Sequence, residues 1–286
     1  GREAVVLIDE YDAPMHDSMK NSDLQEQIRN AMRNLFSPLK GEEKHLRFVF
    51  LTGISKFSQL SIFSELNNIT NISMLDKYSD ICGISRNELV SIFKADIREL
   101  ANENEMTYDE ALSELQHHYD GYHFSGRGED VYNPYSLFNT LASNEFDDYW
   151  FSTGTPTFLI NLLQEKHLDM LDLDDITATA DRFDTPTEKI IDPVPVLYQS
   201  GYLTIKAYNP RSKIFKLGFP NTEVKTGFSN SLFRYYAPDN LGEKDALYAA
   251  YYECLVEHDD MEAFIPHLQT FYKKFPYTLV NNNERH

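Results

Sequence analysis

The stretch Val5-Val6-Leu7-Ile8-Asp9-Glu10-Tyr11-Asp12 joins four consecutive aliphatic residues to two adjacent carboxylates, with a third carboxylate two residues later. The aliphatic run predicts a strand that is buried on both faces, as in a parallel sheet. Ligands of open α/β sheets bind just beyond the carboxyl ends of the strands, where one carboxylate can hold Mg²⁺ on a phosphate and its neighbour can orient water. The pattern therefore predicts a Walker B strand, with Asp9 toward the metal and Glu10 toward the water. An acidic turn after an ordinary core strand is the alternative.

A second buried strand is expected over residues 46–51, after a segment with helical spacing of apolar residues between positions 22 and 39. Strand, helix and strand in this order predict a right-handed βαβ unit with parallel strands. Thr52 and Lys56 then emerge at the same sheet edge as Asp9 and Glu10. Lys56 is the predicted reader of a γ-phosphate, with Thr52 as an alternative, although Thr52-Gly53 also suits a plain turn.

The glycine-rich loop that cradles phosphates has no match in this sequence. No G-x-x-x-x-G-K-[ST] occurs among the 286 residues. Such a loop supplies most of the backbone N–H groups that hold the phosphates. We therefore expect these residues to form half of a nucleotide site, and to bind ATP and Mg²⁺ weakly or not at all without the other half.

Composition limits the class of protein. The net charge is −19, which disfavours broad binding of nucleic acid or anionic membranes. The two cysteines, Cys82 and Cys254, indicate neither a disulfide framework nor a zinc site, so a reducing cytoplasm is the default expectation. No apolar run approaches the roughly 18 residues of a membrane span. The oligomeric state is not indicated by the sequence.

The predicted fold class is α/β plus α. A partial P-loop core with parallel βαβ strands (1–84) is followed by a helical lid (85–170) that contains capping boxes at Ser85 and Thr107. An acidic connection (171–192) leads to a winged-helix-like module of helix, hairpin and helix (193–240). A helical hairpin (241–286) completes the chain. Gly121, in the turn after the second lid helix, is expected to have a positive φ. His117, His118 and His123 are expected to be ordinary lid histidines rather than metal ligands.

Eight segments together resemble the bacterial AAA-ATPase-like family over nearly the whole chain. They are Leu7–Pro14 (LIDEYDAP), Leu51–Ser58 (LTGISKFS), Ser61–Asn68 (SIFSELNN), Tyr119–Phe124 (YDGYHF), Tyr132–Leu137 (YNPYSL), Tyr149–Gly154 (YWFSTG), Tyr198–Ile205 (YQSGYLTI) and Leu217–Asn221 (LGFPN). The resemblance implies an ATPase that usually opens with a P-loop of the R-P-R-R-F-G-K-T type. It also implies an attached PD-(D/E)XK nuclease-like domain as an intramolecular partner. Neither of these two parts is recognised within the sequence.

Two alternatives remain beside an ATP-driven switch for a nuclease-like effector. One is a degenerate ATPase that serves as a scaffold for protein or DNA. The other is a metal-dependent nuclease centre at Asp9, Glu10 and Asp12, which the lack of a nearby catalytic lysine or histidine disfavours.

A local excess of positive charge marks residues 201–235. We expect this basic module to dock on the acidic stretch around Asp169 to Asp184 or on the ATPase core, in preference to weak DNA contact through Arg211 and Lys213.

Overall fold

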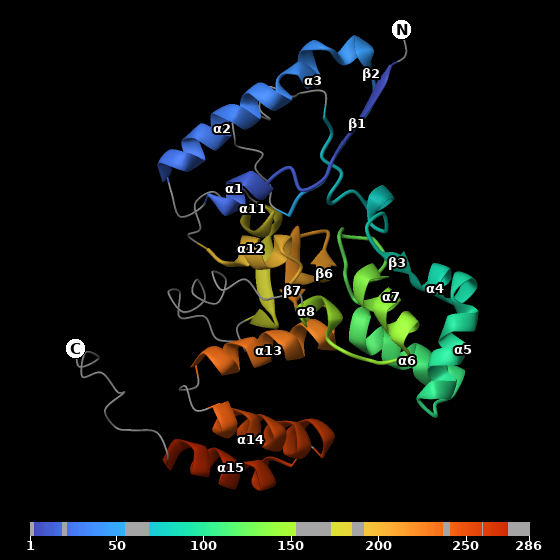
Figure 1. Ribbon diagram of the computed structural model, residues 1–286, viewed down its shortest axis with the longest axis vertical. Helices are drawn as coiled ribbons and strands as arrows, with labels where there is room; N and C mark the ends of the chain where they lie inside the picture. Colours follow the sequence, from blue (N-terminus) through green and yellow to red (C-terminus); the bar gives the residue numbers. More distant parts are fainter. Residues whose placement is uncertain are drawn as a thin grey trace, which may run out of the picture. The chain divides into compact units, whose positions relative to one another are not determined.

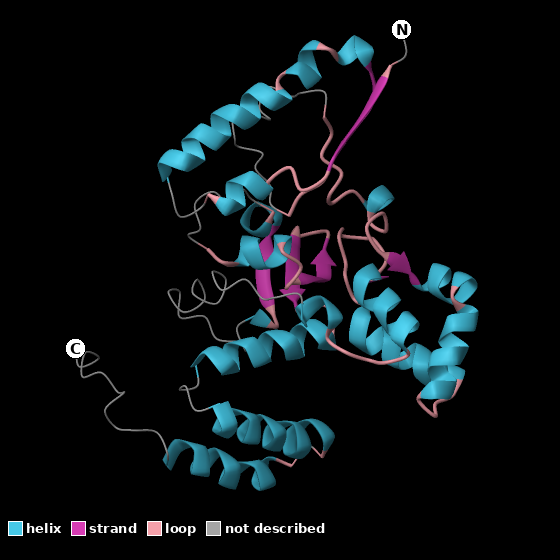
Figure 2. Ribbon diagram, viewed as in Figure 1, coloured by secondary structure: helices cyan, strands magenta, loops and turns pink. Residues whose placement is uncertain are grey.

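The computed structural model describes residues 3–18, 22–54, 69–152, 173–184, 192–236, 241–258 and 260–273 (Figures 1 and 2). Contacts divide the chain into two units, Gly1–Phe228 and Ser229–His286. The described part mixes many helices with small sheets, in agreement with the predicted α/β-plus-α class at that level. The finer domain boundaries stay predictions.

The amino-terminal strands pair as the sequence predicts. Strand β1 (Ala4–Ile8) lies parallel to β2 (Leu46–Leu51), with Val6 opposite Val49. The elements between the strands are α1 (Ala13–Asp17), α2 (Ser22–Phe36), α3 (Pro38–Gly41) and η1 (Glu43–His45). Met15 of α1 and Met32 and Phe36 of α2 form a small buried core. Ile8 of β1 and Leu51 of β2 pack against this core. One face of the strand pair is therefore joined to the helical layer.

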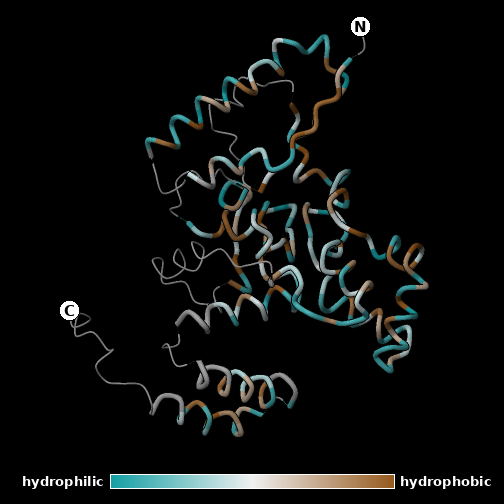
Figure 3. The backbone as a smooth tube through the Cα atoms, viewed as in Figure 1, coloured by the Kyte–Doolittle hydropathy of each residue, from teal (hydrophilic) through white to brown (hydrophobic). Residues whose placement is uncertain are grey.

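The opposite face of this strand pair corrects the expectation of burial on both sides. Val5, Leu7 and Phe48 are 58%, 68% and 53% exposed in the part of the chain that the structure describes. Figure 3 shows how apolar this strand is along its length. Since side chains alternate between the two faces of a strand, α2 covers only the Ile8 side. Burial on both faces needs a second layer, and the described residues of this chain supply one layer.

A helical package over residues 84–143 follows the short helix η2 (Asp76–Tyr78). Its elements are β3 (Ile84–Ser85), α4 (Arg86–Ile92), α5 (Lys94–Glu103), α6 (Tyr108–Tyr119), β4 (Val131–Tyr132) and α7 (Pro134–Ser143). Both predicted capping boxes are confirmed, since Ser85 caps α4 with Glu88 and Thr107 caps α6 with Glu110. Leu89, Ile97, Leu100 and Leu115 are fully buried in one core that is shared by these helices. The package thus has a closed apolar core of its own, while Ile92 on α4 is 65% exposed.

A three-stranded antiparallel sheet with order β5-β7-β6 lies in the same unit. Its elements and their neighbours are α8 (Tyr149–Ser152), β5 (Ile176–Thr179), α11 (Ala180–Phe183), α12 (Val194–Gln199), β6 (Thr204–Asn209), β7 (Ile214–Gly218) and α13 (Thr222–Tyr236). The stretch 171–192 was expected to be an acidic connection, but its residues 176–179 form strand β5, which pairs with β7 in this sheet. Ile176 and Ala178 are buried on one face of β5, and Phe183 is completely buried after it.

The second unit contains the end of α13 and the elements α14 (Leu241–Tyr251), η3 (Tyr252–Glu257) and α15 (Met261–Lys273). Leu247, Ala250, Cys254 and Phe264 form its buried cluster. In the described ranges of the chain, no helix has the length and apolar character that crossing a membrane requires.

Candidate functional site

The carboxyl ends of β1 and β2 bring Asp9 and Thr52 into direct contact. The hydroxyl Oγ1 of Thr52 donates a hydrogen bond to Oδ1 of Asp9. The same carboxylate oxygen accepts the backbone N–H of Glu10, with 3.0 Å between N and Oδ1. The parallel pairing continues past the strands, because the Thr52 N–H donates to the Ile8 carbonyl oxygen at 2.8 Å and the Tyr11 N–H donates to the Thr52 carbonyl oxygen at 3.0 Å. Asp9 is thereby fixed in position at the sheet edge.

Asp12 and Gly53 support this edge, a role that was not predicted for either residue. The Asp12 side chain is only 1% exposed, and its Oδ1 accepts the N–H of Ile54 at 3.3 Å. A Cβ on Gly53 would collide with the carboxylate of Asp12 and the ring of Tyr11. Glycine is therefore required where β2 passes the turn after β1. The signal was present in the sequence, since Thr52-Gly53 marks the end of the strand.

Glu10 differs from Asp9 in its backbone conformation. Its φ is 49°, in the left-handed region that residues other than glycine seldom adopt. Both side chains are exposed to solvent, whereas Thr52 is half-buried. Strained backbone of this kind clusters at ligand-binding and catalytic positions. The turn presents Glu10 outward while Asp9 is tied to β2.

The oxygen donors at this edge are of the type that Mg²⁺ prefers, namely a carboxylate with an adjacent hydroxyl. Among the described residues, no group of three or more His, Cys, Asp and Glu side chains is placed to hold a metal ion. Magnesium on a phosphate needs only one or two protein carboxylates, so Asp9 fits that requirement. Lys56, the predicted phosphate reader, lies outside the described residues.

The three histidines that the sequence places in or after α6 each have a nearby partner. His117 Nε2 lies 2.8 Å from the Thr222 hydroxyl, and His118 Nδ1 lies 3.0 Å from the Glu114 carbonyl oxygen. His123 Nδ1 lies 2.7 Å from an Asp130 carboxylate oxygen.

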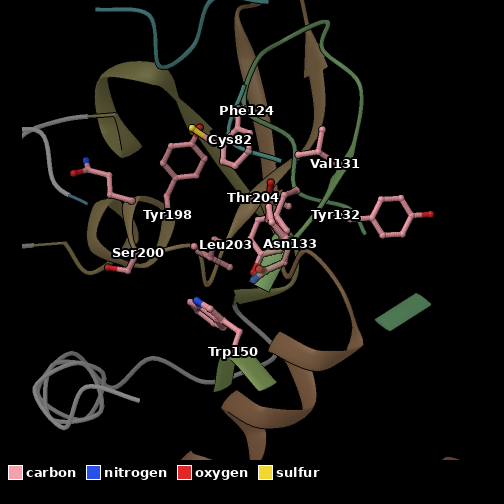
Figure 4. Close-up of a pocket in the computed structure, with 14 residues that line it drawn as sticks. Cys82, Phe124, Val131, Tyr132, Asn133, Trp150, Tyr198, Ser200, Leu203 and Thr204 are labelled. Carbon is pink, nitrogen blue, oxygen red and sulfur yellow. The ribbon is translucent and has the colours of Figure 1, made fainter. Parts of the chain in front are cut away.

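A separate apolar cavity of about 250 Å³ lies beside α12 and β6 (Figure 4). Phe124, Trp150 and Tyr198 contribute its aromatic lining. Two of its polar neighbours are engaged: Asn133 Oδ1 accepts the N–H of Tyr135 at the start of α7, and Thr204 Oγ1 accepts the N–H of His123 at 2.7 Å. The Tyr122 and Tyr132 hydroxyls, by contrast, are buried without a hydrogen-bond partner among the described residues. The ring of Tyr132 points away from the other labelled side chains. The surface that a ligand would contact in this cavity is therefore mainly aromatic.

The basic module forms ion pairs with the acidic stretch, as the docking alternative predicts. Lys216 Nζ lies 2.7 Å from Asp175, and Lys225 Nζ lies 2.6 Å from Asp174. The pairing of β5 with β7 holds the two segments together. DNA contact by Arg211 and Lys213, which are exposed beyond β6, stays a prediction.

Comparison with known proteins gives a partial match. Residues 1–63 match the family model described as a predicted AAA-ATPase. A protein of Azotobacter chroococcum mcd 1, described as an uncharacterized protein in the vnfD 5′ region, is 34% identical over 292 residues. That alignment covers 99% of this chain and 52% of the relative, so the chain spans about half the length of that protein. No solved structure matches the chain. The segment that is similar to predicted AAA-ATPases contains β1, β2 and the residues of their carboxyl edge.

Proposed function

We propose that this chain forms the Walker B and sensor part of an ATPase that binds and hydrolyses ATP with Mg²⁺. The observation that carries the proposal is the hydrogen bond from Thr52 to Asp9 at the ends of two adjacent parallel strands. Both residues fall in the segment that is similar to predicted AAA-ATPases. Nucleotide sites of α/β sheets form at this edge.

Each residue at the edge has a proposed task. Asp9 is the metal anchor, held in one orientation by Thr52. Bound Mg²⁺ would neutralise charge on the phosphates. Glu10 projects from the turn after β1 and polarises the attacking water. Lys56 reads the γ-phosphate, with Thr52 as the alternative reader.

The remaining parts of the chain are proposed to transmit the nucleotide state. The helices of residues 85–170 act as a lid, and the module of 193–240 and the helices of 241–286 connect it to an attached effector. The resemblance of the motifs to the AAA-ATPase-like family suggests a nuclease-like effector. The relative's greater length provides room for such a domain and for a phosphate-binding loop.

Substitution of Glu10 tests the proposal in the full-length protein that it implies. Glu10→Gln is expected to bind Mg-ATP like the wild type and to hydrolyse it about 100-fold more slowly or worse, because an amide is a poor base. Steady-state turnover and calorimetric binding are measured side by side. Glu3→Gln, on the exposed residue before β1, is the control. Turnover of Glu10→Gln at the wild-type rate would refute the assigned role.

A second candidate function is a scaffold with a degenerate ATPase core. It is the alternative if the full-length protein has no phosphate-binding loop of the type G-x-x-x-x-G-K-[ST], which does not occur among these 286 residues. Under this alternative, the wild-type full-length protein shows neither ATP turnover nor saturable binding of Mg-ATP in the same assays.

A further inference from the structure

A polar cavity of about 550 Å³ lies in the first unit, remote in sequence from the β1–β2 edge. Asp120 and Gly121, in the loop after α6, line the cavity. Pro220 and Asn221, in the loop before α13, also line it. Lys206 contributes from β6. The two loops are the YDGY and LGFPN segments, for which the ATPase proposal has no role.

The wall of this cavity is held by close contacts between the loops. Gly121 has a φ of 90°, and a Cβ at this position would collide with the carbonyl oxygen of Pro220. Asn221 Nδ2 donates to the Asp120 carbonyl oxygen at 2.9 Å, and Lys206 Nζ donates to the Pro220 carbonyl oxygen at 3.1 Å. A wall fixed in this way loses little conformational freedom when a ligand enters.

Two opposite charges on the wall, Asp120 and Lys206, form no ion pair among the described residues, although Arg86 lies close enough to lower the pKa of Asp120. Asp120 is 7% exposed, and its Oδ1 accepts no hydrogen bond among the described residues. A buried polar atom without a partner costs free energy. Lys206 forms no ion pair with a carboxylate of the described ranges; the nearby Asp174 is paired with Lys225 and the nearby Asp130 with His123. Burial raises the pKa of Asp120 and lowers the pKa of Lys206, which are the directions expected for poorly compensated charges.

The charge of the lining restricts the class of ligand. Asp120, Asp130 and Asp174 face the cavity with two lysines, which disfavours a multiply charged anion such as a free phosphate. A ligand that carries both an ammonium group and a carboxylate could contact Asp120 and Lys206 together, since both residues line the cavity. We propose that the cavity binds a small zwitterion of the α-amino acid class, with its ammonium group at Asp120 and its carboxylate at Lys206. None of these residues belongs to the proposed nucleotide edge, so the site goes beyond the ATPase proposal.

A binding survey of the wild-type chain tests the ligand class directly. Each of the common amino acids is added at about 10 mM, which reveals dissociation constants up to the low millimolar range as a rise in Tm. The best amino acid is then titrated calorimetrically beside its N-acetyl and its amide derivatives. Each derivative lacks one of the two charges, so both are expected to bind at least about tenfold more weakly than the parent amino acid.

Two variants locate the binding within the cavity. Asp120→Asn and Lys206→Met are each expected to weaken binding of that amino acid at least about tenfold. Asp175→Asn and Lys216→Met are the matched controls, since this pair lies at the surface outside the cavity lining, and they should bind like the wild type. Circular dichroism and Tm verify that each variant is folded. If Asp120→Asn does not fold, Lys206→Met and the derivatives decide the result.

The proposal is overturned if no amino acid raises the Tm of the wild type. It is equally overturned if both derivatives bind as tightly as the parent amino acid, or if the folded cavity variants retain wild-type affinity.

Discussion

The helical package of residues 84–143 and the β1–β2 pair differ in how far they bury their apolar side chains. Leu115 in α6 is completely buried, whereas Leu7 in β1 is 68% exposed in the described part of the chain. The package is built from consecutive helices that cover one another, so a short length of chain is sufficient to close its core. A parallel strand pair needs layers on two faces. Local sequence can therefore complete a helical core more easily than a parallel sheet.

A matched pair of leucine substitutions gives the largest expected effect. Leu115→Ala should lower the free energy of unfolding by about 2–5 kcal/mol, because it opens a cavity in a filled core. Leu7→Ala should change it by about 0.5 kcal/mol or less, since most of that side chain is already in water. Urea denaturation followed by circular dichroism measures both. Equal losses would show that the exposed face of β1 is covered in solution.

The buried carboxyl group of Glu223 should make the stability of the protein depend on pH. Glu223 lies in α13, where it contacts α7 and α8. Its side chain is 0% exposed and accepts hydrogen bonds from the Ser136 hydroxyl at 2.9 Å and the Trp150 N–H at 2.7 Å. Burial raises the pKa of Glu223 from 4.5 to about 7. Between these values the folded protein holds more protons than the unfolded chain, so stability falls as pH rises through this window.

This component of stability should be at most about 3 kcal/mol in the wild type. It should be absent from Glu223→Gln, whose free energy of unfolding relative to the wild type is therefore expected to rise from pH 4.5 to pH 7. Denaturation at a series of pH values gives both profiles. Glu99→Gln, on the exposed side of α5, is the control and should follow the wild type. Parallel profiles for Glu223→Gln and the wild type would contradict the assignment.

The helix caps give a smaller stability effect than the Leu115 core or Glu223. Ser85→Ala and Thr107→Ala should each cost about 1 kcal/mol, because each removes the acceptor for a backbone N–H in the first turn. Ser91→Ala, within α4, should cost less, since the Ser91 hydroxyl donates to the Glu88 carbonyl oxygen of its own helix and caps no backbone N–H among the described residues. The comparison is made by urea denaturation. A larger loss at Ser91 than at both caps would show that the caps do not control these helices.

Features set by neighbours in sequence were predictable. Ser85 and Thr107 bond to residues three positions away, and the positive φ of Gly121 follows from its place in a turn. The contact between Asp9 and Thr52 was also within reach, because parallel strands bring their carboxyl ends to one edge.

Features set by distant partners were not predictable. In β5 only Ile176 and Ala178 carry the alternation, and this four-residue strand is defined by its pairing with β7. The cavity beside Asp120 depends on a loop that follows β7 much later in the chain. The exposure of Val5 and Leu7 could not be inferred from their own sequence, which is that of a buried strand.

The magnesium dependence of ATP binding tests the central claim most directly. In the full-length protein, ATP affinity is measured calorimetrically with Mg²⁺ and with a chelator, for the wild type, Asp9→Ala and the control Asp175→Asn. The account predicts that Mg²⁺ tightens ATP binding about tenfold or more in the wild type and the control, and that Asp9→Ala loses this gain because the metal has lost its protein anchor. An undiminished effect of Mg²⁺ in folded Asp9→Ala would contradict the claim that the β1–β2 edge is the metal site.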